Sequence, residues 1–179
     1  MPQLVALLRG INVGKAKRVV MADLRRLLTD LGYTNPRTLL NSGNAVFGAT
    51  AAQARSAEAT IRRGIAEQLG VDCAVLTRTA GELAATIEHN PFPQATAEPS
   101  KFLVGFLSGP VPAHRRQELA SADYGADELS FGDGVVYLWC AGGILDSPLS
   151  KLAWSSLGVQ VTTRNWTTLT KLADLAASS

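Results

Sequence analysis

The chain passes from an apolar strand into a basic loop at Leu4-Val5-Ala6-Leu7-Leu8-Arg9-Gly10-Ile11-Asn12-Val13-Gly14-Lys15-Ala16-Lys17-Arg18. Its five leading apolar residues predict a strand over Leu4–Leu8, and the glycines after them mark a turn. Residues 1–26 carry a net charge of +5, whereas the rest of the chain carries −3. This polarity predicts that an anionic partner would meet the protein at the loop.

Helical and extended patterns alternate along the first half of the chain. Apolar residues at helical spacing predict helices at Met21–Leu31, Gln53–Leu69 and Ala80–Glu88. Short apolar runs predict strands at Thr38–Leu40, Ala45–Phe47 and Cys73–Leu76. The first two of these strands are joined by a turn, Asn41-Ser42-Gly43-Asn44. Two prolines in Asn90-Pro91-Phe92-Pro93 prevent the last helix from continuing.

The order of elements then starts again. The polar segment Gln94–Ser100 is predicted to link two halves, residues 1–93 and 94–179. Strands are expected at Phe102–Leu107, Glu128–Phe131, Val135–Trp139 and Val159–Thr163. Helices are expected at Ala113–Ala120, Ser150–Leu157 and Thr167–Ala176. The repeated order βαββαβ predicts an α+β fold built from two ferredoxin-like halves.

The composition is that of a folded protein. Hydrophobic residues make up 46% of the chain and charged residues 18%, which excludes a disordered, highly charged chain. A chain of 179 residues buries enough surface to fold without a disulfide or a metal. Cys73 and Cys140 lie in apolar runs and are predicted to be reduced core thiols, with a disulfide or redox pair as the alternative.

Targeting, membrane and metal signals are missing from the sequence. Met1-Pro2-Gln3 is not the basic start of a signal peptide, and no apolar run approaches the ~18 residues of a membrane helix. We therefore expect a cytoplasmic protein with no membrane partner. His89 and His114 stand apart from other metal-binding residue types, so neither a metal site nor a cofactor is predicted.

The basic loop invites comparison with the phosphate-binding P-loop. A P-loop has four residues between its glycines and a Ser or Thr after its lysine, which binds Mg²⁺. Here three residues separate Gly10 from Gly14, and Ala16 follows Lys15. Both differences argue against nucleotide hydrolysis of the P-loop type.

A looser anion-binding role remains open for this loop. Glycines let the backbone approach a ligand, and a helix beginning near Met21 would add its positive N-terminal end. Charge and first contacts would come from Arg9, Asn12, Lys15, Lys17 and Arg18. The alternatives are a solvated connection between strand and helix, and a protein-binding surface.

A second candidate contact lies near the other end of the chain. Asn165 is suited to cap the last helix, and Trp166 to anchor it in the core. Arg164 before a helix N-terminus is equally suited to a phosphate or carboxylate, and Trp166 to stacking on a base. Further ligand contacts are expected if the halves bring these residues together: Asn44, Lys151, Arg164 and Asn165.

The turn that holds Asn44 has two interpretations. Asn and Ser side chains commonly bond their own backbone in turns, but their amides and hydroxyls can also read a ligand. Ser42 is a weak candidate for a nucleophile because no Gly-x-Ser-x-Gly elbow surrounds it. No catalytic residue is predicted.

Several motifs in fixed order resemble the bacterial family of domain-of-unknown-function 1697, whose members share a Leu-Arg-Gly-Ile-Asn-Val-Gly segment. The matching segments are Leu8-Arg9-Gly10-Ile11-Asn12-Val13-Gly14, Arg37-Thr38, Ser42-Gly43-Asn44-Ala45-Val46-Phe47, Asn90-Pro91-Phe92-Pro93, Ser150-Lys151-Leu152, Thr162-Thr163-Arg164-Asn165-Trp166-Thr167 and Lys171-Leu172. The resemblance implies two related α+β halves packed as a pseudo-dimer, and it implies no established activity. The chain departs from the family pattern at Lys15-Ala16-Lys17, where Gly-Lys-Asn is usual, and at Val20, where proline is usual.

These patterns favour a protein that binds an anionic ligand at the basic loop. The ligand would be a nucleotide, a phosphorylated metabolite or the backbone of a nucleic acid. An enzyme, such as a hydrolase or transferase acting on that ligand, is the first alternative, and it requires a general base that the sequence does not identify. A protein–protein interaction module without a small ligand is the second alternative.

Overall fold

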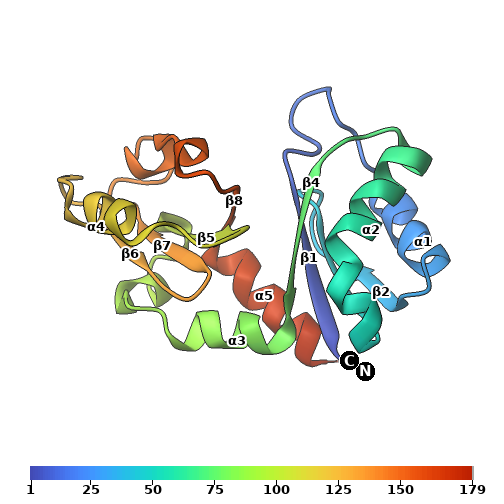
Figure 1. Cartoon of the computed structure of the whole chain (residues 1–179). Helices are drawn as coiled ribbons and strands as arrows, with labels where there is room; N and C mark the ends of the chain where they lie inside the picture. The colour runs from blue at the N-terminus through green and yellow to red at the C-terminus, as the bar shows by residue number, and fades with distance from the viewer. Residues whose placement is uncertain (179) are drawn as a thin grey trace. The chain divides into compact units, whose positions relative to one another are not determined.

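The computed structural model describes residues 1–178, which form two four-stranded antiparallel sheets and five α-helices. The first half contains β1 (Gln3–Arg9), α1 (Met21–Asp30), β2 (Thr34–Thr38), β3 (Asn44–Gly48), α2 (Ala51–Leu69), β4 (Ala74–Thr79) and α3 (Ala80–Glu88). The second half contains β5 (Phe102–Leu107), α4 (Ala113–Ser121), β6 (Glu128–Phe131), β7 (Val135–Trp139), β8 (Val161–Asn165) and α5 (Trp166–Ala177). Figure 1 shows these elements in chain order. Ser179, at the end of the expected second half, lies outside the described residues.

The two sheets have the same topology. Their strand orders are β2-β3-β1-β4 and β6-β7-β5-β8, and all neighbouring strands are antiparallel. The central strands β1 and β5 are buried along almost their whole length. The expected α+β architecture is confirmed, and each sheet has the strand order of a ferredoxin-like half.

Two compact units, which we call the N-terminal and C-terminal units, divide the chain. The N-terminal unit contains Met1–Ala84 and the chain from Lys171 onward, and the C-terminal unit contains Ala85–Thr170. The boundaries therefore fall inside α3 and α5, in contrast to the halves 1–93 and 94–179 expected from the sequence. The proline-rich segment is folded, with 3-10 helices at Pro93–Thr96 and Pro99–Lys101. Phe92, which precedes it, packs edge-on against Phe102 at 5.8 Å between ring centroids.

In the N-terminal unit, α1 and α2 cover one face of the sheet (Figure 1). The side chains that β1 and β3 turn to this face are Leu4, Ala6, Leu8, Ala45 and Phe47. They form one buried cluster with Leu24, Leu27 and Leu28 of α1 and with Ala57, Ile61 and Ile65 of α2. Burial of this cluster by two amphipathic helices is the principal hydrophobic contribution to the unit.

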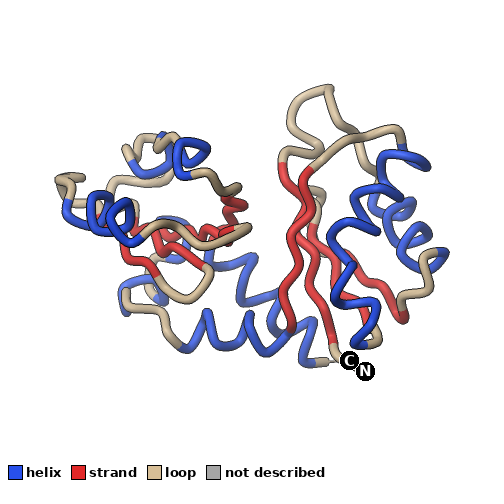
Figure 2. The backbone as a smooth tube through the Cα atoms, viewed as in Figure 1, coloured by secondary structure: helices blue, strands red, loops and turns tan. Residues whose placement is uncertain are grey.

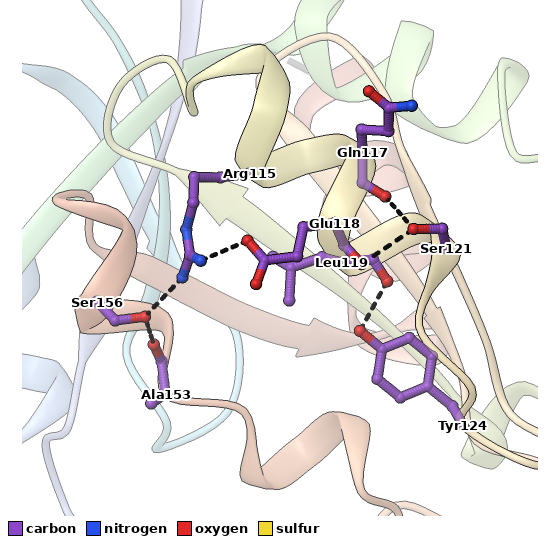
Figure 3. Close-up of polar contacts among 8 residues, drawn as sticks. All are labelled: Arg115, Gln117, Glu118, Leu119, Ser121, Tyr124, Ala153 and Ser156. Carbon is purple, nitrogen blue, oxygen red and sulfur yellow. Dashed lines mark hydrogen bonds and ion pairs between the residues drawn. The ribbon is translucent and has the colours of Figure 1, made fainter.

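The C-terminal unit lacks one of the expected helices. Residues 149–157 form two 3-10 helices, Leu149–Lys151 and Trp154–Leu157, in place of the helix predicted at Ser150–Leu157. Serine hydroxyls here bond nearby carbonyls, as Ser156 Oγ does to Ala153 O at 2.7 Å, and so compete with α-helical hydrogen bonds. Arg115 of α4 donates to Ser156 Oγ at 3.5 Å and to Glu118 at 2.5 Å, which ties this segment to α4 (Figure 3).

Three edge strands lie elsewhere than predicted. β2 covers Thr34–Thr38 and not Thr38–Leu40, because an edge strand tolerates Pro36 where its register shifts. β4 extends to Thr79, beyond the predicted Cys73–Leu76. β8 covers Val161–Asn165 and not Val159–Thr163. The last two shifts place arginines within strands, which bears on the candidate site.

Candidate functional site

Residues 10–20, which we call the basic loop, connect β1 to α1. Figure 2 shows this connection as a long tan loop that extends past the end of the sheet. Its backbone turns through positive φ angles at Gly10 (71°) and Gly14 (63°), and also at Asn12 (54°) and Lys17 (50°). Asparagine tolerates this region better than other side-chain-bearing residues, and glycine enters it freely. The loop therefore has a defined and partly strained backbone.

The Asn12 side chain closes the base of the loop. Its Oδ1 accepts a hydrogen bond from Val19 N at 2.9 Å, and its Nδ2 donates to Val19 O at 2.8 Å. The same Nδ2 donates to Asn41 O at 2.7 Å, in the turn between β2 and β3. Ile11 and Val19 are buried beside it. Asn12, expected as a ligand contact, thus holds the two ends of the loop together and ties them to the neighbouring turn.

Four cations surround this closed loop. Arg9, Lys15, Lys17 and Arg18 are all exposed, and within residues 1–178 none of them has an ion-pair partner. Some other basic residues are paired with acids, as in the Arg62–Asp72 pair at 3.0 Å. The four cations therefore present an uncompensated positive charge to solvent.

The start of α1 adds to this positive end. The helix N-cap is Val20, which has no side chain able to accept a hydrogen bond from the first-turn N–H groups. The positive end of the helix dipole thus lies directly after the cations of the basic loop.

Asn44, expected to line a ligand site, is fully buried in β3. Its Nδ2 donates to Leu39 O at 2.7 Å and to Ser42 Oγ at 3.0 Å. These bonds hold the turn that precedes β3, so the Asn44 amide has a structural role. This geometry agrees with the interpretation in which the Asn and Ser side chains of the turn bond the nearby backbone.

The remaining expected contacts belong to the C-terminal unit. Lys151 is exposed at the end of a 3-10 helix. Asn165 Oδ1 accepts a hydrogen bond from Thr168 N at 2.8 Å, which confirms the N-cap interpretation. Trp166 is buried, with its ring 5.2 Å from that of Phe102, so it anchors α5 in the core.

Arg164 lies inside β8, opposite Val104 of β5, and not in a loop before α5. Its side chain is largely buried, with 9% of the residue exposed, and Nη1 donates to Thr163 O at 2.9 Å. Burial lowers the pKa of the guanidinium to about 10, which leaves it charged at neutral pH. Arg164 is therefore a charge held within a sheet face.

The sequence interpretation missed Arg78, which occupies the equivalent place in the N-terminal unit. Arg78 lies opposite Val5 of β1, as Arg164 lies opposite Val104 of β5. Arg78 Nη1 donates to the preceding carbonyl, Thr77 O, at 2.8 Å, which repeats the geometry of Arg164. The signal was available in the sequence, because the triplets Thr77-Arg78-Thr79 and Thr163-Arg164-Asn165 are similar.

The capping residues after these arginines are also equivalent. Thr79 Oγ1 accepts a hydrogen bond from Glu82 N at 3.1 Å, while Glu82 Oε2 accepts from Thr79 N at 2.7 Å, which forms a capping box for α3. Asn165 has the same position before α5. In both units the strand thus ends in an arginine followed by the N-cap residue of the next helix, which begins without an intervening loop.

We expect replacement of Asn165 by alanine to destabilise the protein by about 1 kcal/mol, the usual cost of losing an N-cap. Urea unfolding followed by circular dichroism measures this loss. Thr167→Ala, an exposed change in the same helical turn, is the matched control and should stay within about 0.5 kcal/mol of the wild type. Equal effects of the two changes would contradict the capping role.

Both cysteines are free and buried. Burial, together with the nearby Asp72 carboxylate, raises the pKa of the Cys73 thiol, while Lys17 and Arg62 lower it. Burial also raises the pKa of Cys140. Neither thiol is therefore activated as a nucleophile.

Residues 1–178 show neither a metal site nor a membrane-spanning helix. They contain no cluster of three or more His, Cys, Asp or Glu side chains arranged for a metal ion. None of their helices combines the length and the apolar character needed to cross a bilayer.

The fold defines the class of this protein as α+β, with two ferredoxin-like halves. A family model described as "Protein of unknown function (DUF1697)" matches residues 1–137, so the chain belongs to this family. The resemblance drawn from the sequence motifs is thereby confirmed for the family, while the motifs at 150–152 and 162–167 lie beyond the matched residues.

One solved structure extends the likeness to nearly the whole chain. The conserved bacterial protein SP0830 from Streptococcus pneumoniae is 23% identical, the match covers 98% of each chain, and the TM-score is 0.78. At this identity the likeness shows a common fold. No curated protein matches the chain.

Proposed function

We propose that the protein binds phosphate-bearing anions at the basic loop. Arg9, Lys15, Lys17 and Arg18 make the contacts, and Asn12 acts by shaping the loop. The shared chemistry is a phosphate group, carried by a nucleotide, a phosphorylated metabolite or a nucleic acid backbone. The site is confined to the N-terminal unit.

The observation that carries the proposal is a comparison between the two halves. Eleven residues, 10–20, join β1 to α1, whereas five residues, 108–112, join β5 to α4 at the equivalent place. The shorter connection, Ser108-Gly109-Pro110-Val111-Pro112, has no charged residue. Five uncharged residues are thus enough to make this connection, so the length and the charge of the basic loop require another explanation than chain connection.

The closed geometry of the loop supports the same proposal. The hydrogen bonds of Asn12 hold the loop before any ligand arrives, and a preorganised loop loses less conformational entropy on binding. The start of α1, which has no side-chain cap, favours an anion over a neutral ligand. We also place the protein in the cytoplasm, where the two buried thiols stay reduced.

Removing two of the loop lysines should weaken phosphate binding. We expect Lys15→Ala/Lys17→Ala to lower the affinity for tripolyphosphate or for a labelled single-stranded oligonucleotide about tenfold, because two phosphate contacts are lost. For the oligonucleotide, the slope of log affinity against log salt should fall by about two. Isothermal titration calorimetry measures the affinity for tripolyphosphate, and fluorescence anisotropy measures the affinity for the oligonucleotide.

The control removes the same charge from other surfaces. Arg55→Ala/Arg116→Ala deletes two exposed arginines outside the loop and should leave both affinities within twofold of the wild type. An equal loss of affinity in both double variants would show that the effect comes from net charge alone. A wild-type protein that binds neither probe would overturn the proposal.

A further inference from the structure

Exposed aliphatic side chains gather beside the cations of the basic loop. Val13 is 73% exposed, Val20 61% and Leu40 54%. Val13 and Val20 belong to the loop, and Leu40 to the turn 39–43 that Asn12 ties to it. Among residues 1–178, only two other large hydrophobic residues, Met1 and Leu145, are as exposed. Large apolar side chains held in water at a single location indicate an interaction surface.

The loop and the turn form one surface because the Asn12 side chain bonds the backbone of both. Asn12 Nδ2 reaches Val19 O and Asn41 O, whose residues are the chain neighbours of Val20 and Leu40. Leu40 has a φ of 61°, a left-handed conformation that leucine rarely adopts. The protein thus holds a leucine in a strained backbone while leaving its side chain exposed, which a connecting turn does not require.

This surface combines aliphatic and cationic groups, and the acid that follows it along the chain, Asp23 in the first turn of α1, lies 3.5 Å from Arg26. No Asp or Glu occurs between Arg9 and Ala22, and no aromatic residue occurs there or in the turn 39–43. Single-stranded nucleic acids are usually held by aromatic stacking in addition to charge. Protein interfaces concentrate binding energy in Trp, Tyr and Arg and are depleted in Lys. Neither pattern matches this surface.

A lipid surface matches it better. Aliphatic side chains enter the boundary between headgroups and acyl chains, while lysine and arginine contact anionic phosphates. A bilayer is also a flat partner that a protruding loop can meet without a complementary groove. We infer that the basic loop and the turn 39–43 together dock the protein on a membrane surface rich in anionic phospholipid.

This inference rests on the proposed function, since the phosphate is now that of a lipid headgroup. It departs from the sequence expectation of no membrane partner. That expectation came from the lack of a spanning segment, which does not bear on a peripheral contact.

Vesicle co-sedimentation tests the inference. The wild-type protein should bind vesicles made of phosphatidylglycerol and phosphatidylcholine in equal parts, and should not bind vesicles of phosphatidylcholine alone. Val13→Asn/Leu40→Asn should lower partitioning about tenfold but leave the melting temperature and the affinity for tripolyphosphate unchanged, because asparagine tolerates the backbone at position 40. Leu145→Asn, which removes an exposed leucine outside this surface, is the matched control and should bind as the wild type does.

The outcomes separate this inference from the proposed function. If the wild-type protein binds tripolyphosphate but not vesicles, the lipid partner is overturned and phosphate binding stands. If it binds neither, the inference and the proposed function are both overturned. Vesicle binding by Val13→Asn/Leu40→Asn at the wild-type level would show that the aliphatic residues take no part, and would overturn the inference. Two other results would also overturn the lipid partner. A tenfold fall in the oligonucleotide affinity of that variant would identify a nucleic acid as the occupant. A dimer that light scattering detects in the wild type but not in that variant would identify a second copy of the chain.

Discussion

Replacing Gly43 with alanine should destabilise the N-terminal unit by about 3 kcal/mol or more. Gly43 has a φ of 94°, and a Cβ built on it would lie 2.8 Å from both Leu8 Cβ and Ile11 Cδ1. Leu8 Cβ is fixed to β1, and Leu8 N also donates to Gly43 O at 2.8 Å, so the strand cannot retreat without losing this bond. Overpacking and backbone strain therefore add at one position.

Gly70→Ala separates the two contributions to this loss. Gly70 also has a positive φ, 68°, but a Cβ there meets no atom within 4 Å. Its replacement should cost only about 1 kcal/mol, which is the price of the backbone conformation. Urea unfolding of both variants gives the difference, which reports the collision in the turn. Equal losses would show that the turn moves freely away from Ile11, contrary to the packing described above.

The central strands and most helices could be predicted because their patterns are local. The apolar run Phe102–Leu107 and the segment Ala80–Glu88 have the bounds that the sequence indicated. The turn between β6 and β7 is equally local, because it contains Asp133-Gly134, a pair typical of tight hairpin turns, and Gly134 has a positive φ of 67°. In these segments the residues themselves determine the element.

The edge strands could not be predicted because their partners determine them. Thr77, Arg78 and Thr79 are polar, and they are extended because they pair with β1. Arg164 was likewise expected in a loop and lies in β8, where pairing with β5 holds it. The segment 149–157 has apolar residues near helical spacing, but its serines bond the local backbone instead. Polar residues in strands and serine-rich crossovers are where local patterns fail.

The candidate site, too, could be predicted from the sequence only in part. Its charge was visible in the sequence, since Lys15, Lys17 and Arg18 follow one another closely. Its shape was not, because the partner of Asn12 in the turn, Asn41, is 29 residues away. Asn12 and Asn44 therefore looked like ligand contacts, whereas both amides bond the backbone. An asparagine in a glycine-containing loop should be weighed first as a structural link.

Replacing Asn12 with alanine should destabilise the protein by about 3 kcal/mol, since three hydrogen bonds to backbone groups are lost. Two of those groups, the N–H and the carbonyl of Val19, belong to a buried residue, where water cannot replace the lost bonds. Alanine also tolerates the φ of 54° at this position less well than asparagine. Urea unfolding measures the loss, and hydrogen exchange of the loop amides locates it.

Two matched variants assign the effect to its causes. Asn12→Gly removes the same hydrogen bonds but suits the positive φ, so it should be about 1 kcal/mol more stable than Asn12→Ala. Asn12→Asp keeps an acceptor for Val19 N but turns a carboxylate toward the carbonyls of Val19 and Asn41, so it should be no more stable than Asn12→Ala. If Asn12→Asp were instead as stable as the wild type, the amide donors would not hold the loop.

The same variants distinguish a shaping role from a direct contact. If Asn12 only shapes the loop, Asn12→Ala should weaken tripolyphosphate binding several-fold, because the cations must then be ordered when the ligand binds. Asn12→Gly, which leaves the loop equally untied, should weaken binding at least as much even though it is the more stable variant. A direct contact would instead be lost on any change at Asn12, including one that leaves the loop amides protected from exchange. The shaping role is supported if variants with less protected loop amides also bind tripolyphosphate more weakly. It is contradicted if a variant loses affinity for tripolyphosphate while its loop amides stay protected from exchange.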